Sequence, residues 1–409
     1  MPAASLPEFS VSPTDPDFVQ NPYRAYESMR ALGPAFFWRD YGHAFFSGYA
    51  EVNAILRDRR FGREVTHVMS REAAGLPPIP GHLDRFYAFE ANSMLEREPP
   101  VHTRLRKLVN RAFVSRNIAT LRPVIERLAD ELIDRFPKGE AFDLLPAFCE
   151  PVPVMVIADL LGVPREMSGQ LLAWSHAMVA MYQFNRGRET EDAALAAMDA
   201  FSDYVRALAE DRRKAPRADL ISALVEARDA GDQLSEDELV TTVILLLNAG
   251  HEATVHGLGN GIKAILEHGV DPATLFADER TAERAADELL RLDPPLHNFN
   301  RYVLEDCEIA GIALKKGAVV GLLLGSANHD GRRYARPDRL DVERGADNHV
   351  AFGAGIHFCL GAPLARLEMA TALPVLFRRL PGLRLAEPPL YADRYHFHGL
   401  ERLMVVADT

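Results

Sequence analysis

Cysteine is scarce in this sequence, whose 409 residues include only Cys149, Cys307 and Cys359. An odd number without framework spacing excludes a disulfide-stapled secreted scaffold and is typical of a reducing compartment. Residues 1–9 contain no basic region followed by an apolar core, so we expect no signal peptide. These absences together predict a cytoplasmic protein.

Long apolar runs and a basic excess are missing as well. The longest apolar stretch lies around residues 243–247, which is far too short to span a bilayer. Acidic residues outnumber Lys and Arg by 58 to 46, and the formal net charge is −12. An acidic chain without a basic block is not expected to bind nucleic acid. We therefore expect neither a membrane nor nucleic acid as a partner.

Apolar sequence with helical periodicity is abundant. Hydrophobic residues make up 48% of the chain, enough for a large core, and no linker, low-complexity tract or repeat divides it. We expect one domain over residues 1–409. Helices are predicted at residues 118–136, 192–214, 235–268, 281–292 and 360–380, and a charged loop at 211–217. Strand patterns are short, at residues 44–46, 308–312, 319–324 and 403–406. The fold class predicted is mainly α with small β-sheets.

A glycine-rich run from Phe352 to Gly361 precedes the last predicted helix. Gly353 and Gly355 permit positive φ angles and a close backbone approach, so N–H groups can point at the sulfur of Cys359. The helix that follows places the positive end of its dipole beside that sulfur. A thiolate needs such donors to stay ionised and bind a metal. A lone cysteine is more often a small buried hydrophobe, but the spaced glycines and the helix start favour a metal ligand.

The run resembles the haem-binding loop of the cytochrome P450 family, Phe-x-x-Gly-x-His-x-Cys-x-Gly, and every defining position is filled. The resemblance implies a haem b (iron protoporphyrin IX) with Cys359 as the proximal ligand and Phe352 and Gly353 beside it. A thiolate opposite oxygen donates electron density and favours O–O cleavage. The fold implied is that of the family, with haem between a long central helix and the cysteine loop.

The predicted helix at 235–268 begins with a capping box, in which Ser235 accepts from the amide of Glu238. At 1.5 Å per residue it is about 50 Å long. Its residues 249–254 resemble the oxygen-binding segment of the family, which implies that Ala249 and Gly250 border the haem and that Glu252 relays protons. Ala253 replaces the usual threonine, and a methyl group cannot hydrogen-bond. We hypothesise that ordered water, a substrate hydroxyl or Thr254 completes the relay. Gly250 is interpreted as leaving room for a small ligand beside the helix.

Glu288 and Arg291 resemble the buried Glu-x-x-Arg pair of the family, and Arg344 matches a third arginine that joins this pair. The resemblance implies that the three residues support the cysteine loop. An ordinary surface ion pair is the alternative for such spacing.

Cations for the haem propionates are implied at four positions, which are His102, Arg106, Arg301 and His357. The alternative for any of them is a surface cation, and it is preferred for Arg104, Lys107 and Arg111. Those three residues are a candidate basic patch for an acidic electron-transfer protein.

A hydrophobic small-molecule substrate is predicted from candidate pocket residues, which could equally be ordinary core. They are Tyr87, Phe89, Met181, Leu245, Asn248, Phe299 and Phe397. The resemblance implies a monooxygenase that uses O2, with electrons from a separate protein, expected to be a ferredoxin with its NAD(P)H-dependent reductase. An H2O2-using peroxygenase remains as an alternative, which only Ala253 favours and against which Glu252 weighs. A non-catalytic haem sensor ranks lower.

Overall fold

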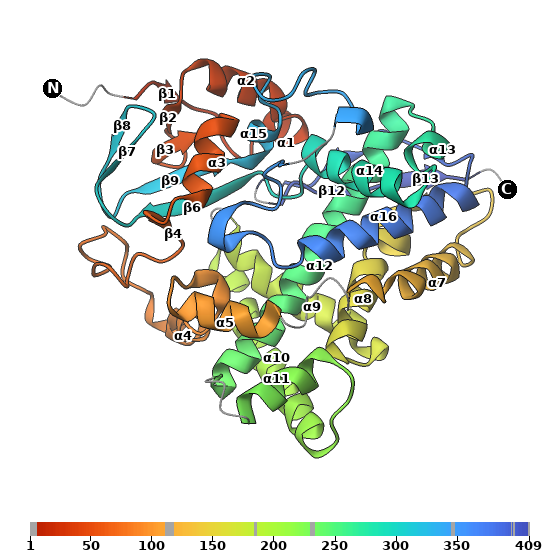
Figure 1. Ribbon diagram of the computed structural model, residues 1–409, viewed down its shortest axis with the longest axis horizontal. Coiled ribbons are helices and arrows are strands. Elements are labelled where there is room, and N and C mark those ends of the chain that lie inside the picture. The colour runs from red at the N-terminus through yellow and green to blue at the C-terminus, as the bar shows by residue number, and fades with distance from the viewer. Residues whose placement is uncertain are drawn as a thin grey trace.

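The computed structural model describes residues 6–110, 118–183, 186–229, 234–344, 348–393, 395 and 397–407. The strands of its main sheet gather with the N-terminal helices on one side of the molecule, and helices around the long helix α12 occupy the other, together with β12 and β13 (Figure 1). This mainly helical architecture with small sheets confirms the predicted fold class.

The helices are bounded as follows: α1 Pro16–Gln20, α2 Tyr23–Ala31, α3 Tyr49–Arg57, α4 Asp84–Glu90, α5 Val101–Asn110, α7 Arg122–Ile133, α8 Pro151–Leu161, α9 Ser168–Val179, α10 Arg188–Lys214, α11 Leu220–Asp229, α12 Glu236–His268, α13 Pro272–Leu275, α14 Glu279–Leu292, α15 Leu324–Asn328 and α16 Ala362–Arg379.

The main sheet has six strands in the order β1 (Glu8–Phe9), β2 (Ala35–Trp38), β3 (His43–Phe46), β9 (Val319–Leu323), β6 (Asn298–Val303) and β4 (Phe61–Gly62). Strands β3 and β9 pair in parallel, whereas β6 pairs antiparallel with β9, so that Arg301 lies opposite Val320. Smaller sheets join β10 (Arg384–Leu385), β13 (Met404–Val406) and β5 (Phe142–Asp143), then β11 (Leu390–Tyr391) with β12 (Leu400–Arg402), and β7 (Cys307–Ile309) with β8 (Ile312–Leu314).

Helix α12 forms where the sequence predicts it. Ser235 accepts from the amide of Glu238, and the carboxylate of Glu238 accepts from the amide of Ser235, which completes the capping box. Gly269 ends the helix with φ +60°, a left-handed conformation that glycine adopts without a steric penalty. The helix packs against α8, α10, α14 and α16. Burial on almost all sides makes it the central support of the fold.

Two local expectations are wrong. The charged stretch at 211–217 is not all loop, because α10 continues to Lys214 and leaves only the following residues for the turn. Residues 308–312 are not one strand, because Ala310 and Gly311 take positive φ angles of 50° and 79° and turn the chain into the β7–β8 hairpin. Across the described residues, none of the helices combines the length and apolarity that crossing a bilayer requires.

Candidate active site

The cysteine loop, residues 350–361, connects the region of the main sheet to α16. Gly353 and Gly355 take φ angles of +67° and +72°. A Cβ on Gly355 would collide with the carbonyl oxygen of Leu56, so only glycine fits there. The amide of Cys359 donates to the carbonyl of Phe352 at 2.9 Å, which closes the loop. The helix predicted at 360–380 would include Gly361, but α16 begins at Ala362 and Gly361 is its N-cap.

The sulfur of Cys359 is accessible and surrounded by donors. Cys359 is exposed, whereas Ala351 and Ala354 of the same loop are buried. Desolvation by the surrounding protein raises the pKa of the thiol, and this effect exceeds the opposing hydrogen bonds from the Gly361 and Ala362 amides and the charge of Arg106. The free thiol therefore carries its proton at neutral pH. A metal ion would displace that proton, and the same donors would then stabilise the thiolate.

Helix α14 supports the cysteine loop through Asp287. Its carboxylate Oδ1 accepts from Arg366 Nε at 2.6 Å and lies 3.1 Å from His349 Nε2. The guanidinium of Arg366 lies 4.6 Å from the centre of the Phe352 ring. Asp287 thus fixes the start of the loop and, through Arg366, the aromatic ring next to the sulfur.

The predicted network of Glu288, Arg291 and Arg344 is assembled and buried. Glu288 and Arg291 are both 0% exposed, and the Nε of Arg291 donates to Glu288 at 2.7 Å. Arg344 Nε donates to the other oxygen of Glu288 at 3.2 Å. Arg291 also donates to the carbonyl of Asn328 at 2.9 Å, and the Asn328 side chain accepts from the amide of Val350 at 2.8 Å. The network is therefore connected to the first residue of the cysteine loop.

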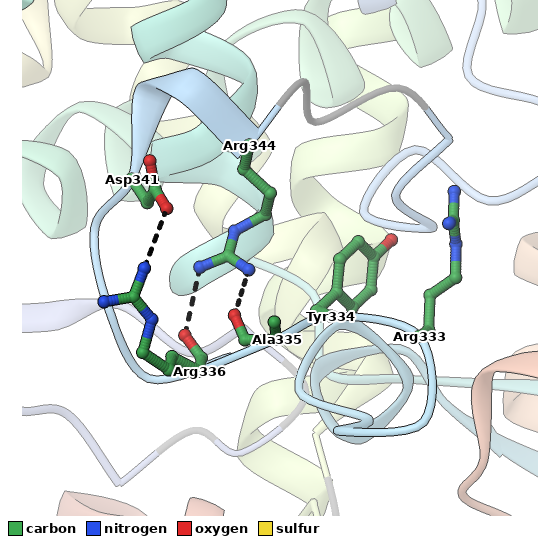
Figure 2. Close-up of a pocket in the computed structure, with 6 residues that line it drawn as sticks. All are labelled: Arg333, Tyr334, Ala335, Arg336, Asp341 and Arg344. Carbon is green, nitrogen blue, oxygen red and sulfur yellow. Dashed lines mark hydrogen bonds and ion pairs between the residues drawn. The ribbon is translucent and has the colours of Figure 1, made fainter.

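Figure 2 shows the outer side of this network. A surface pocket of about 330 Å³ is lined by Arg333, Tyr334, Ala335, Arg336, Asp341 and Arg344. Arg344 donates to the carbonyls of Ala335 and Arg336, and Arg336 pairs with Asp341 at 3.7 Å. The guanidinium groups of Arg336 and Arg344 therefore already bind protein oxygens, so this pocket is the outer side of the network.

Arg301 on β6 is a buried cation. It is 4% exposed, and its Nη1 donates to the carbonyl of its neighbour Asn300 at 2.9 Å. It forms no ion pair within the part of the chain that the structure describes. Burial, together with the charge of Arg63, lowers the pKa of Arg301 to about 9. A buried guanidinium without a carboxylate partner is costly, and an anionic ligand would stabilise it.

The other three predicted cations lie on the α5 side of the cysteine loop. Arg106 Nη2 donates to the carbonyl of Phe358 at 2.5 Å. The rings of His102 and His357 are 4.4 Å apart, and His357 Nε2 lies 2.9 Å from Glu98 Oε1. Burial and the charges of His357 and Arg106 lower the pKa of His102 to about 4. His102 is therefore neutral at pH 7, and Glu98 already neutralises part of the local positive charge.

A shallow basic surface borders this site. A pocket of about 400 Å³ is lined by His102, Thr103, Arg106, Lys107, Asn110, Gly355 and Ile356. Lys107 is exposed there, as the candidate basic patch requires. Arg104, for which a surface cation was the preferred interpretation, has a side chain that is 29% exposed and forms an ion pair with Glu238 at the start of α12. Arg111, the third residue of that patch, lies outside the described residues.

The middle of α12 has one exposed position. Ala249 is exposed, although most of the surrounding helix is buried. A Cβ on Gly250 would lie 2.8 Å from Cγ1 of Ile157 on α8, so the glycine allows close packing of two helices. That contact replaces the predicted explanation that Gly250 makes room for a ligand. Thr254 is 6% exposed, and Ala253 lies between it and Glu252.

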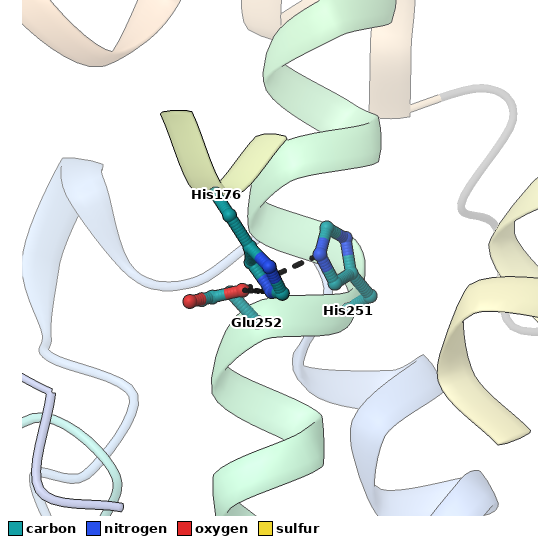
Figure 3. Close-up of side chains that lie close together, drawn as sticks. All are labelled: His176, His251 and Glu252. Atoms are coloured by element: carbon teal, nitrogen blue, oxygen red, sulfur yellow. Dashed lines mark ion pairs between the residues drawn. The ribbon is translucent and has the colours of Figure 1, made fainter. Parts of the chain in front are cut away.

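Glu252 interacts with two histidines. Its Oε2 lies 3.3 Å from His176 Nε2, which comes from α9, and 3.4 Å from His251 Nε2 (Figure 3). Burial works against the charge of Glu252, but the two imidazoles outweigh it and hold the pKa of the carboxyl well below its usual range. Glu252 is therefore a charged group at neutral pH.

The predicted pocket residues differ in their surroundings. Tyr87, Phe89 and Leu245 are half-buried against the main core, and Met181 is 6% exposed. Asn248 Oδ1 is buried without a hydrogen-bond partner among the described residues. Phe299 lies against Gly353 and the guanidinium of Arg301, on the cysteine-loop side. Phe397 forms a backbone bridge to Leu296, and its ring lies 6.0 Å from that of His256.

The family model described as Cytochrome P450 matches residues 51–269 and 282–381 of this chain. The chain belongs to the cytochrome P450 family. It is 36% identical over 403 residues to a Bacillus subtilis protein named polyketide biosynthesis cytochrome P450 PksS, with 96% of this chain and 97% of the relative covered. It is 34% identical over 392 residues to 6-deoxyerythronolide B hydroxylase of Saccharopolyspora erythraea, covering 94% and 96%.

Solved structures agree with this assignment. The crystal structure of P450BioI in complex with an acyl carrier protein ligated to hexadec-9Z-enoic acid superposes with a TM-score of 0.88 at 32% identity, covering 96% of this chain and 100% of that one. This cytochrome P450 is therefore an oxidoreductase of the monooxygenase class with a haem cofactor.

The residues present fit a haem. Cys359 offers an accessible sulfur, and Arg301 is a buried cation that an anionic group would stabilise. A Cβ on Gly361 would lie 3.9 Å from the sulfur, so the N-cap leaves space beside it. Ala249 gives an exposed methyl on an otherwise buried helix, as a flat apolar group requires.

Sequence reasoning missed several residues of this site. Arg63 lies beside Arg301 and pairs with Glu96 at 2.5 Å, and Glu98 contacts His357. His176 and Asp287 were also not predicted. The position of Glu98, just before the Pro99-Pro100 pair that leads into α5, is a local hint. Nothing near His176 in the sequence indicates its contact with α12.

Proposed function

We propose that this cytochrome P450, as one domain in the cytoplasm, uses haem b to insert one oxygen atom from O2 into a hydrophobic small molecule. The observation that supports this most is the accessible sulfur of Cys359, held by the cysteine loop beside the amides of Gly361 and Ala362. When bound, the haem activates O2 at its iron for insertion into a C–H bond or across a double bond. The protein supplies ligation, orientation and proton control.

Cys359 would bind the iron, with Phe352 and Gly353 beside the sulfur. Arg301 would pair with a propionate, because its guanidinium is buried without a carboxylate partner. His102, Arg106 and His357 would contact the propionates from the α5 side. An anion near His102 would raise its pKa from about 4, since a negative charge favours the protonated ring.

Glu252 would carry protons into the pocket. It is buried and charged, and His176 connects it to solvent because half of the His176 side chain is exposed. The methyl of Ala253 cannot extend the path. Thr254 offers a hydroxyl one residue later, so we propose that Thr254, water or a substrate hydroxyl completes the relay.

Polar groups for orienting a substrate are few among the proposed pocket residues. Ala249, Leu245 and Met181 offer apolar surface, and the unpaired Oδ1 of Asn248 can accept one hydrogen bond from a hydroxyl or amide. Such a combination suits an apolar molecule with one donor. The relatives named for polyketide biosynthesis and for 6-deoxyerythronolide B hydroxylation support a substrate of this class.

Electrons would come from a ferredoxin with its NAD(P)H-dependent reductase. The exposed Lys107 and the half-buried Arg106 line the basic surface next to the cysteine loop, where an acidic partner would approach the sulfur side. A peroxygenase that takes oxygen from H2O2 is the second candidate function, because Ala253 interrupts the proton path that O2 chemistry needs.

Two experiments test the proposal: the first identifies the ligand of the haem iron, and the second identifies the oxidant that supports turnover. Cys359→His should retain haem while the ferrous carbonyl spectrum changes from thiolate-type to imidazole-type. Cys307→Ala is the control, since Cys307 lies on β7 outside the cysteine loop. A thiolate-type spectrum from Cys359→His would contradict the assignment. Turnover with reduced ferredoxin and O2, but not with H2O2, is expected, and the reverse would identify a peroxygenase.

A further inference from the structure

Three potential metal ligands meet where α9 crosses α12. His176, His251 and Glu252 each offer one ligand atom, and these atoms all lie within 4.8 Å of one another. Figure 3 shows the His176 ring reaching down from α9 to the carboxylate, with His251 on the other side. The side chains of His251 and Glu252 are 3% and 7% exposed, whereas that of His176 is 50% exposed.

The His251 ring is oriented as a ligand would be. Its Nδ1 lies 2.7 Å from the carbonyl of Leu247, one turn earlier on α12. A carbonyl can only accept, so Nδ1 carries the proton and donates it. In the neutral ring, Nε2 then presents a lone pair, and it is buried without a hydrogen-bond partner among the described residues. Metal-bound histidines have the same arrangement, with the second ring nitrogen donating to a carbonyl.

The lone pair of His251 faces a carboxylate oxygen. Two lone pairs 3.4 Å apart repel, so a positive charge between or beside these atoms would be stabilised. Protonation of the ring supplies one such charge. A divalent cation supplies another without protonating a buried imidazole.

The distances fit a small transition-metal ion. Tetrahedral zinc has Zn–N and Zn–O bonds of about 2.0–2.2 Å, so two ligand atoms are about 3.4 Å apart. The two measured separations are 3.3 Å and 3.4 Å. Glu150, near enough to interact electrostatically with all three residues, adds a further negative charge. The exposed side of His176 gives the ion a route from solvent.

We propose that His176, His251 and Glu252 form a binding site for a divalent transition-metal ion of the zinc class, which joins α9 to α12. Two imidazoles and one carboxylate are typical ligands for such an ion, and the fourth position is open to water.

A second cluster, Asp293 with His297 and His398, does not have these properties. Its ligand atoms are also within 4.8 Å, but all three residues are buried. Asp293 already accepts hydrogen bonds from the hydroxyls of Tyr23 and Tyr391. Nε2 of His297 and Nε2 of His398 have no hydrogen-bond partner among the described residues, but the carboxylate is satisfied and no member is exposed. An ion would therefore find neither a free carboxylate nor an entry route.

Metal binding would regulate oxygenation. This consequence rests on the proposed function, in which Glu252 delivers protons. A bound ion would hold the carboxylate between two imidazoles and prevent it from accepting a proton. Zinc would thus lower the amount of product formed per reduced nicotinamide consumed.

The experiment measures zinc binding to the haem protein. Chelator-treated holoenzyme is dialysed against a series of free Zn²⁺ concentrations, and zinc is measured by elemental analysis relative to haem iron. We expect saturation at about one high-affinity zinc per iron. Changes to residues that only orient a ligand cost about 10–100-fold in affinity, so loss of a direct ligand in His176→Ala should cost at least about 100-fold.

Two further variants make the result specific. Glu252→Gln keeps the shape of the side chain, removes its negative charge and should weaken binding similarly. His82→Ala is the matched control, because His82 also contacts a carboxylate, Glu191 at 2.8 Å, on another surface. Equal zinc affinity in His176→Ala and His82→Ala, or no saturable site, would overturn the proposal. Zinc that binds but leaves product yield unchanged would instead refute the role of Glu252 in proton delivery.

Discussion

Arg291 offers the most demanding test of how the cysteine loop is supported. All of its hydrogen-bonding capacity is used: two bonds go to Glu288 and three to the carbonyls of Asn328, Pro337 and Arg339. The residue is 0% exposed. Arg291→Met preserves much of the side-chain volume. It leaves the charge of Glu288 compensated only in part, by Arg344. It also leaves three backbone carbonyls without the hydrogen-bond donor that Arg291 supplies.

The expected magnitude follows from that environment. Removing one partner of a buried ion pair costs about 3–5 kcal/mol, because the remaining charge stays desolvated. Arg291→Lys keeps the charge but not the planar fork, so its loss should be smaller. Arg379→Met is the matched control. Arg379 pairs with Asp130 at 2.7 Å and Asp134 at 2.6 Å, but its side chain is 38% exposed, and such surface pairs are worth under about 1 kcal/mol.

The assay is urea unfolding of the purified variants, followed in parallel by circular dichroism and by the haem absorption. Arg291→Met should lower the midpoint much more than Arg379→Met and should lose haem first, because Asn328 connects Arg291 to Val350 of the cysteine loop. Equal midpoints for the two variants would refute the buried network as a source of stability. Haem release that coincides with global unfolding would refute its connection to the loop.

Three other changes have defined outcomes. Gly355→Ala should weaken haem retention and cost about 1–2 kcal/mol or more of stability, because the backbone at this position is left-handed and the new Cβ would meet the Leu56 carbonyl. Gly169→Ala is the control, since its Cβ would lie in open space and the change should be neutral. Equal haem retention in the two variants would contradict this reasoning. Burial lowers the pKa of His329 to about 3, so the unfolded chain binds the extra proton and stability should fall as pH drops from about 6.5 toward 3. Urea midpoints measured across that pH range should fall less steeply for His329→Gln than for the unchanged protein. An unchanged slope would rule His329 out as the cause. Ala253→Thr should increase the product formed per reduced nicotinamide consumed if the missing hydroxyl limits proton delivery, and unchanged coupling would show that it does not.

The sequence alone determined the elements whose causes are local. The capping box and Gly269 set the ends of α12 because the partners of a helix end lie within four residues. The Gly-rich run likewise specified the cysteine loop, since positive φ angles at Gly353 and Gly355 are backbone properties of those positions. The cytochrome P450 fold could be recognised from such patterns, and Cys359 could be predicted as the haem ligand. The Glu288–Arg291 spacing was visible, but its burial was not.

Only the tertiary structure decided contacts between elements that are distant in the chain. It brought His176 of α9 to Glu252 of α12, and Glu98 to His357 of the cysteine loop. It also showed that Gly250 accommodates Ile157 of α8. Such pairs depend on the rotation and crossing of packed helices, which periodicity within one helix does not specify. Chemistry carried by single motifs could thus be predicted, whereas the charge balance around Glu252 and around the four candidate propionate cations became visible only in the assembled fold.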